Sequence, residues 1–193
     1  MRIGLYGGTF DPVHLGHLRA AETAREVMGL DLVAFLPAAV PPHRGTPLSA
    51  AADRLAMVRL ATTPHPHFEA WDAELRRPGP SYTVETVSRL VSERPSDSFV
   101  LVVGADTWPE IMTWREPERL LSLVEVVVVD RPGYPGPEPE APFPRARGVT
   151  RAEGPSLPVS ATAIRERARQ GRSVRYLVPD AVADYIVARR LYT

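Results

Sequence analysis

Short apolar runs alternate with stretches in which apolar residues recur at helical spacing. The runs have the length and continuity of buried strands, and they occupy residues 3–6, 32–36, 68–71, 99–103 and 123–129. The stretches between them predict helices, which cover residues 15–28, 49–60 and 83–91 and begin again near residue 106. Strands that alternate with helices in this way predict an α/β fold built on a doubly wound parallel sheet.

Several predicted elements end in recognisable residues. Gly29 predicts the end of the first helix, Ser49 is expected to cap the second, and Asp180 is expected to cap the last. Closing helices over residues 160–169 and 180–189 predict a small C-terminal helical part. The proline-rich stretch 130–158 predicts a loop with one short strand near Val149, which is either a plain surface insertion or a cover for a site. With no internal repeat, residues 1–193 are expected to form a single domain.

The composition excludes several kinds of chemistry. All 23 basic residues are arginine, and the chain has no lysine and no cysteine. A thiol nucleophile, a cysteine-ligated metal, a lysine Schiff base and a P-loop lysine are therefore impossible. The 23 acidic residues balance the charge, which gives no overall attraction to a nucleic acid polymer or a membrane surface. The longest apolar run is far shorter than the roughly 20 residues of a membrane helix, and the N-terminus lacks the form of a signal peptide, so we expect a cytoplasmic protein.

The most informative segment, residues 7–17, lies where the first predicted strand passes into the first helix. Gly7 and Gly8 allow main-chain N–H groups to approach a ligand, and the start of the helix offers further N–H groups and a positive dipole end. His14 and His17 are three positions apart, so both imidazoles are expected to face one anion. Either histidine alone would more often be structural, but the combination favours a phosphate. The Gly-x-Gly-x-x-Gly fingerprint of dinucleotide-binding oxidoreductases is absent.

Residues 7–17 read Gly-Gly-Thr-Phe-Asp-Pro-Val-His-Leu-Gly-His and resemble the Gly-x-Phe-x-Pro-x-His-x-Gly-His signature of the nucleotidyltransferase superfamily. Residues 159–165 resemble the second motif of that superfamily, Ile-Ser-Ser-Thr-x-Ile-Arg, with Ala161 in place of the second serine. The resemblance implies a Rossmann-like nucleotidyltransferase fold. It also implies that the start of this helix and Arg165 hold the β- and γ-phosphates of a nucleoside triphosphate.

Other segments resemble the bacterial nicotinate mononucleotide adenylyltransferases in particular. Residues 41–44 are similar to the Pro-Pro-His-Lys loop of that family, with Arg44 in place of lysine, and residues 77–83 to its Arg-x-Gly-x-Ser-Tyr-Thr turn. Residues 104–106, followed by Trp114 and Arg115, resemble its Gly-x-Asp strand end and downstream tryptophan. Members of that family transfer AMP from ATP to nicotinate mononucleotide in NAD biosynthesis, giving nicotinate adenine dinucleotide and pyrophosphate.

The resemblance implies roles for individual residues. Protonated His17 would stabilise the α-phosphate with His14 beside it, and Arg165 would bind the departing pyrophosphate. The other residues of the ATP site would be Gly8, Thr9, Phe10, Gly16, Gly104, Asp106, Ser160 and Thr162. The residues that contact the mononucleotide would be His43, Arg44, Thr83, Trp114 and Arg115.

Three of these implied roles are specific. Trp114 would stack on the pyridine ring, Thr83 would donate to the nicotinate carboxylate, and Asp106 would accept from a ribose hydroxyl of ATP. Mg²⁺ would arrive with ATP, held by phosphate and water oxygens, and no protein ligand is assigned to it.

Other functions stay open at this level. Nicotinamide mononucleotide differs from nicotinate mononucleotide only by a carboxamide in place of a carboxylate. Phosphopantetheine adenylyltransferases perform the same chemistry, but they have no use for Trp114 and residues 81–83. A non-catalytic nucleotide sensor would bind ATP without releasing pyrophosphate. The sequence gives no indication of the oligomeric state.

Overall fold

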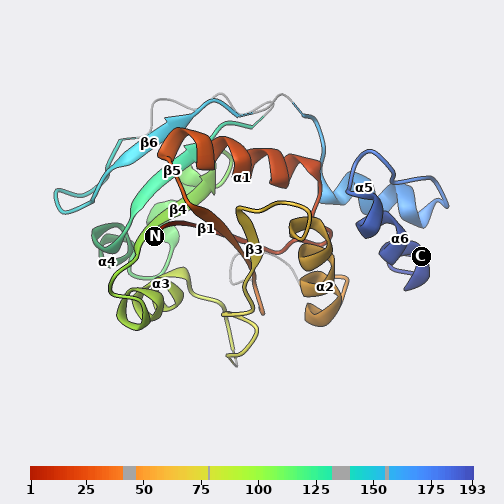
Figure 1. Ribbon diagram of the computed structural model, residues 1–193, viewed down its shortest axis with the longest axis horizontal. Coiled ribbons are helices and arrows are strands. Elements are labelled where there is room, and N and C mark those ends of the chain that lie inside the picture. The colour runs from red at the N-terminus through yellow and green to blue at the C-terminus, as the bar shows by residue number, and fades with distance from the viewer. Residues whose placement is uncertain (41–46, 78, 132–139, 155–156) are drawn as a thin grey trace.

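Six parallel strands form one sheet in the order β3-β2-β1-β4-β5-β6 (Figure 1). The computed structural model describes residues 1–40, 47–77, 79–131, 140–154 and 157–193. The strands are β1 (Arg2–Gly8), β2 (Leu32–Pro37), β3 (Phe68–Ala70), β4 (Ser98–Gly104), β5 (Glu125–Val129) and β6 (Val149–Ala152). The helices are α1 (Leu15–Met28), α2 (Ala51–Thr62), α3 (Thr83–Glu93), the 3-10 helix η1 (Trp108–Thr113), α4 (Pro117–Leu123), α5 (Ala161–Arg169) and α6 (Asp180–Ala188). The predicted α/β fold with a doubly wound parallel sheet is confirmed.

Alternate side chains of each strand point to opposite faces of the sheet and build two hydrophobic cores. Val33 and Phe35 of β2 belong to the core that contains apolar residues of α1, α2, α5 and α6. Leu32 and Ala34 belong to the core that contains those of α3, η1 and α4. The helices before β3 thus cover one face of the sheet, and those between β3 and β5 cover the other. The strand order reverses direction at β1, because β2 and β3 are added on one side of it and β4 on the other. In open sheets of this kind, the crevice at such a point is where ligands bind.

The ends of two helices differ from the prediction. Ser49 does not cap α2, because its hydroxyl donates to the buried carboxylate of Asp11, and Ala50 is the N-cap residue instead. The N-cap residue of α6 is Pro179 rather than Asp180, whose carboxylate pairs with Arg175 at 3.1 Å.

The segment after β4 also differs from the prediction. The helix expected near residue 106 is the short 3-10 helix η1, and it is followed by a second helix, α4, that the sequence did not reveal. Leu123, predicted as the start of a strand, ends α4, and the strand begins at Glu125. An apolar run cannot by itself separate the end of a helix from the start of a strand, although Pro117 at the first turn of α4 is a typical start signal.

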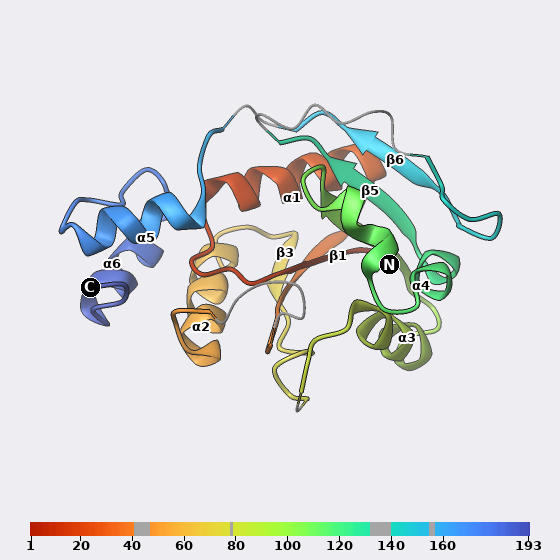
Figure 2. The same ribbon diagram turned by 180° about the vertical axis from the view of Figure 1, so that it is seen from behind.

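Helices α5 and α6 lie together at one end of the molecule, beyond α1 and α2 (Figures 1 and 2). Val182 and Ile186 of α6 share a core with Met57 of α2. A polar contact reinforces this packing, because the Tyr185 hydroxyl donates to the Asp53 carboxylate of α2 at 2.8 Å. The predicted C-terminal helices are thus present, and they rest on the sheet through α2.

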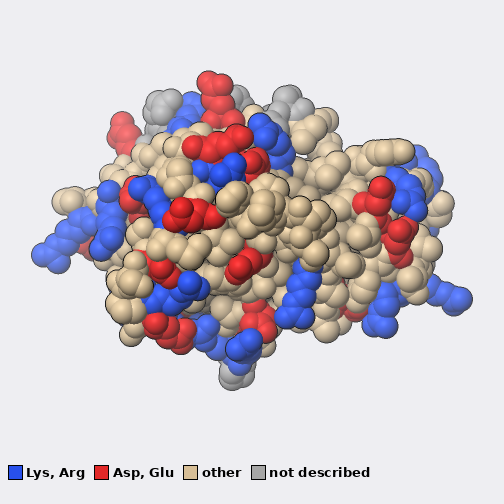
Figure 3. Space-filling view, in the orientation of Figure 1, with Lys and Arg blue, Asp and Glu red and all other residues tan. Residues whose placement is uncertain are grey.

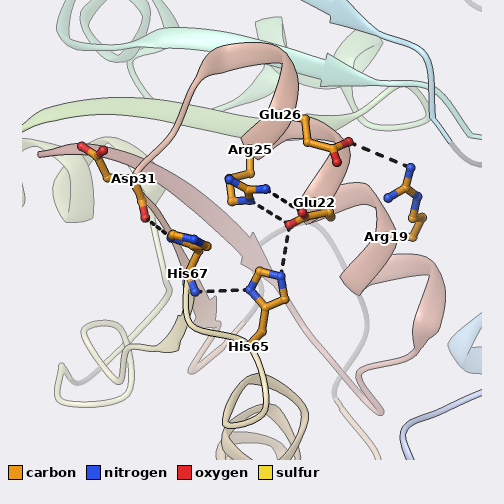
Figure 4. A network of polar contacts seen from close by, with 7 residues as sticks. All are labelled: Arg19, Glu22, Arg25, Glu26, Asp31, His65 and His67. Carbon is orange, nitrogen blue, oxygen red and sulfur yellow. Dashed lines mark hydrogen bonds and ion pairs between the residues drawn. The ribbon is translucent and has the colours of Figure 1, made fainter.

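A polar network joins α1 to the residues directly before β3 (Figure 4). Glu22 accepts two hydrogen bonds from Arg25, at 2.7 and 2.9 Å, and pairs with His65 at 3.4 Å. The hydrogen bond from Arg25 lowers the pKa of Glu22 below its ordinary value. The ring of His67 lies 3.0 Å from the carbonyl oxygen of Asp31. These contacts fasten α1 to the edge of the sheet.

Basic and acidic side chains are interspersed over the face drawn in Figure 3. Many arginines are paired with neighbouring carboxylates, as Arg175 is with Asp184 at 2.6 Å. None of the described helices is both long enough and apolar enough to span a bilayer.

Candidate active site

A cavity of about 600 Å³ lies at the carboxyl ends of β1 and β4, where the strand order turns back. The predicted residues that line this cavity are Gly8, Thr9, Phe10, His14, Gly16, His17, Thr83, Gly104, Asp106, Trp114, Arg115, Ser160, Thr162 and Arg165. His43 and Arg44 lie outside the described residues. The structure therefore brings both predicted motifs and three of the five predicted mononucleotide contacts, Thr83, Trp114 and Arg115, to one cavity.

The turn from β1 into α1 is shaped by a close approach between Gly8 and Phe10. A Cβ atom on Gly8 would lie 2.9 Å from the ring of Phe10, so a side chain at position 8 would displace that ring. The ring of Phe10 packs edge-on against the imidazole of His17, with centroids 5.1 Å apart. Phe10 is buried, so it helps to orient the His17 ring through this contact and offers little surface to a ligand.

The two histidines differ in environment although their rings are stacked. His14 is only 2% exposed, and burial together with the charge of Arg131 lowers the pKa of His14 to about 4. Its imidazole is therefore neutral at neutral pH. The Nδ1 atom of His17 accepts the main-chain N–H of His14 at 3.2 Å, which leaves Nε2 as the ring nitrogen that can donate to a ligand. The protonated form of His17 implied by the resemblance stays a prediction.

Arg165 links the two predicted motifs directly. Its Nη1 donates to the carbonyl oxygen of Asp11 at 2.8 Å, and its Nη2 donates to Oγ1 of Thr162 at 3.2 Å. Ser160 caps α5, because its hydroxyl oxygen accepts the N–H of Ala163 at 3.2 Å. The first turn and the start of α5 therefore converge on one cavity, as the sequence predicted.

Asp106 is paired in this structure. Nη1 of Arg131 donates to Oδ2 of Asp106 at 2.6 Å, and both side chains line the cavity. A Cβ atom on Gly104 would lie 2.5 Å from Oδ1 of Asp106, so Gly104 leaves the space that the carboxylate occupies. Sequence reasoning missed Arg131. Its position just after β5, at the same edge of the sheet as the end of β4, is the signal that could have found it.

The described mononucleotide contacts Thr83, Trp114 and Arg115 line the same cavity. Thr83 is the first residue of α3, and Trp114 directly follows η1. Glu85 of α3 pairs with Arg115 at 3.0 Å, and the guanidinium of Arg115 lies 4.6 Å from the ring centroid of Tyr82. These contacts join the segment that carries Trp114 to the start of α3.

Glu74 is a buried carboxyl group in the wall of the cavity that sequence reasoning did not select. Burial raises its pKa, although it accepts hydrogen bonds from the hydroxyls of Ser81 and Thr86, the latter at 3.2 Å. The hydroxyl of Ser81 in turn accepts the N–H of Ala39 at 2.8 Å. Glu74 therefore ties the segment after β2 to the start of α3. A charged residue just before the Arg-Pro-Gly turn was the available signal.

Known proteins resemble this chain over its whole length. Residues 5–167 match the cytidylyltransferase-like family. The chain is 47% identical over 192 residues to a protein of Thermus thermophilus named as a probable nicotinate-nucleotide adenylyltransferase, with 100% of both chains covered. A protein of Symbiobacterium thermophilum with the same name is 45% identical over 197 residues, which cover 99% of this chain and 95% of that protein.

Among solved structures, the Plasmodium falciparum nicotinic acid mononucleotide adenylyltransferase in complex with NaAD superposes with a TM-score of 0.82 at 16% identity, over 99% of this chain and 97% of that one. This likeness supports the Rossmann-like fold, and the family match together with the sequence relatives defines a nucleotidyltransferase. The chain belongs to the cytidylyltransferase-like family and, within it, to the group of the nicotinate-nucleotide adenylyltransferases.

Proposed function

We propose that the protein is a nicotinate mononucleotide adenylyltransferase, which transfers AMP from ATP to nicotinate mononucleotide and releases pyrophosphate, as a step in NAD biosynthesis. The observation that carries the proposal is the convergence of the His14–His17 turn, Arg165 and Trp114 on one cavity. We place the phosphate site where the β1–α1 turn and α5 line this cavity, and the aromatic end where Trp114 lines it. The names of the relatives supply the same substrates.

The proposed reaction needs no protein nucleophile. A phosphate oxygen of the mononucleotide attacks the α-phosphorus of ATP, so a new phosphorus–oxygen bond forms while the bond to the bridging oxygen breaks. Pyrophosphate leaves with that electron pair. Catalysis then depends on alignment of the two substrates and on stabilisation of charge on the α-phosphate and the leaving group. This suits a chain without cysteine and lysine.

Each group of the phosphate site has a proposed role. The Nε2–H of His17 donates to an oxygen of the α-phosphate, and neutral His14 holds the His17 ring in place by stacking. Arg165 neutralises the departing pyrophosphate, together with the free N–H groups at the start of α5. Asp106, beside Arg131, accepts from a ribose hydroxyl of ATP.

The aromatic end of the cavity is assigned to the mononucleotide. Trp114 stacks on the pyridine ring, while Thr83 and the main chain at Arg115 donate to the nicotinate carboxylate. His43 and Arg44, outside the described residues, stay predicted contacts of the mononucleotide.

Mg²⁺ would be bound together with ATP. The described residues contain no group of three or more histidine, aspartate or glutamate side chains that could hold a metal ion by themselves. We therefore assign the ion to phosphate and water oxygens, which Mg²⁺ prefers, and we route no step of the reaction through it.

The test is to incubate the purified protein with ATP, Mg²⁺ and each mononucleotide separately, and to measure pyrophosphate. We expect release with nicotinate mononucleotide and much slower release with nicotinamide mononucleotide or phosphopantetheine. Faster release with either of these would reassign the substrate, and ATP binding without any release would indicate a nucleotide sensor. The cytoplasmic location stays a prediction, which cell fractionation tests.

A further inference from the structure

Four side chains from outside the β1–α1 turn, those of Ser49, Arg54, Arg165 and Tyr192, bind polar groups of residues 9–11. Arg54 of α2 donates to the carbonyl oxygen of Thr9 at 2.9 Å, and Arg165 of α5 donates to that of Asp11 at 2.8 Å. Tyr192, the residue before the last, donates its hydroxyl to Oδ1 of Asp11 at 2.7 Å, across 181 positions of sequence. The geometry of the turn therefore depends on elements far away in the chain.

The carboxylate of Asp11 is the centre of this arrangement. It is only 4% exposed, and a buried carboxylate is stable only where donors surround it. Its Oδ2 accepts the N–H of Leu48 at 2.7 Å, and its Oδ1 accepts the hydroxyls of Ser49 and Tyr192. Burial lowers the pKa of the neighbouring Arg54, and the charge of Asp11 opposes that effect. Each donor to Asp11 thus supports a buried pair of charges under the turn.

Tyr192 is held firmly enough to act as one of these donors. The N–H of Leu191 donates to the carbonyl of Ile186 at 3.0 Å, and that of Arg190 donates to the carbonyl of Val187 at 3.1 Å, so the chain end folds back on α6. Tyr192 adopts a φ of 67°, a left-handed conformation that persists for such a residue only where its surroundings fix it. Its hydroxyl is also 3.4 Å from that of Ser49.

We propose that Tyr192 is a positioning residue for the phosphate-binding turn, an inference that rests on the proposed function. Tyr192 is not among the described residues that line the cavity, so it acts through Asp11 and not on a substrate. By fixing the carboxylate, it also fixes the carbonyl to which Arg165 donates, and so the direction in which that guanidinium faces the phosphates. The chain end that carries Tyr192 therefore belongs to the machinery that aligns ATP.

The test compares two tyrosine hydroxyls of the same helical part. Y192F removes the hydroxyl bound to Asp11 and keeps the ring. Y185F removes a hydroxyl that donates to Asp53 of α2 at 2.8 Å, a carboxylate that does not bind the turn. We expect Y192F to lower kcat by about 10-fold, because misalignment of reacting groups costs rate steeply, with KM for nicotinate mononucleotide within about twofold of the wild type. Y185F should keep kcat within about twofold.

Equal kcat values for Y192F and the wild type would overturn the inference. An equal loss of kcat in Y192F and Y185F would also overturn it. So would a loss of kcat in Y192F that is explained by a lowered Tm, because either result would indicate a general structural role. A kcat loss confined to Y192F, with a Tm no lower than that of Y185F, supports it. S49A, which removes the other hydroxyl on Oδ1 of Asp11, should reproduce part of that loss.

A second measurement separates this inference from the proposed function. Calorimetric titration with ATP and Mg²⁺ reports the phosphate site without turnover, and we expect about 10-fold weaker binding for Y192F alone. If the wild type releases no pyrophosphate, the proposed function fails, and the ATP affinities still decide the role of Tyr192. In a protein without turnover, unchanged ATP affinity in Y192F would overturn the inference, and so would the absence of ATP binding by the wild type.

Discussion

The imidazole rings of His14 and His17 lie stacked, with centroids 3.7 Å apart and 25° between their planes. The main-chain N–H of His14 is also bound by Nδ1 of His17, at 3.2 Å. Because these contacts fix the position of the His17 ring and leave Nε2 as its donor nitrogen, the Nε2–H is a preorganised donor. Preorganised donors cost no reorganisation when charge develops on a phosphate, which is the source of their effect on rate.

Replacement of His17 by alanine should therefore lower kcat by about 10²-fold, as expected for the loss of one charge-stabilising donor. The measurement is steady-state pyrophosphate release, with circular dichroism to verify that the fold survives. H65A is the matched control, since His65 belongs to the network that joins α1 to the edge of the sheet. It should keep most of the activity. A loss of less than threefold in H17A would remove His17 from the proposed mechanism.

The buried imidazole of His14 makes stability depend on pH. An unfolded histidine takes up a proton near pH 6.5, whereas folded His14 stays neutral down to about 4, so the unfolded chain binds more protons in this window. The contribution of neutral His14 to the free energy of unfolding is therefore fully present above pH 6.5 and is lost as the pH falls toward 4. The difference in pKa amounts to roughly 3 kcal/mol in the free energy of unfolding.

Urea unfolding of the wild type and of H14Q, from about pH 7.5 to about pH 4, measures this effect. The free energy of unfolding of the wild type relative to H14Q should decrease as the pH falls, because glutamine does not titrate. Subtraction of the H14Q curve removes the contribution of the other four histidines. Parallel curves for the two proteins would mean that His14 is not a buried neutral imidazole.

The sheet and the location of the cavity could be predicted because both follow from local patterns. Strands β1 and β2 are short apolar runs that end at Gly8 and Pro37, and helix α1 ends where Gly29 takes a left-handed φ of 58°. Once such strands are parallel, their carboxyl ends meet at one edge, which brings Asp106 and the β1–α1 turn together. Most of the other predicted site residues, such as Thr83 and Trp114, rest on the resemblance of their segments to a known family and not on this rule.

Contacts between distant residues could not be predicted, because they depend on how the elements pack. The position of Arg131 after β5 indicates the edge of the sheet at which it lies, but not that it binds Asp106. No local pattern indicates that Tyr192 binds Asp11 across almost the whole chain. The same limit explains the error at Ser49. Its sequence context is that of a helix cap, but in the structure its hydroxyl donates to the buried carboxylate of Asp11, which needs donors.

Trp114 and Trp108 offer a test of the mononucleotide end of the cavity. Both are partly buried against the same core, but only Trp114 is among the described residues that line the cavity. W114A should raise KM for nicotinate mononucleotide by about 10-fold, because the stacking surface is lost, and should leave KM for ATP nearly unchanged. W108A should lower Tm without this selective change. An equal increase of both KM values in W114A would show that Trp114 does not stack on the mononucleotide.

The role of Asp106 can be tested from the side of the substrate. Two ATP analogues are compared with ATP in the wild type, one without the 2′-hydroxyl and one without the 3′-hydroxyl. The analogue that lacks the hydroxyl from which Asp106 accepts a hydrogen bond should have a KM about 10-fold higher than that of ATP, since that bond is lost. D106A should raise KM for ATP by a similar factor, and it should abolish the difference between ATP and that analogue, because the partner is already absent. D106N keeps an acceptor oxygen but weakens the pair with Arg131, which is 2.6 Å long in the wild type, so it should be intermediate. If the penalty for the missing hydroxyl persists in D106A, the ribose is bound by another group, and Asp106 serves only to hold Arg131 at the carboxyl end of β5.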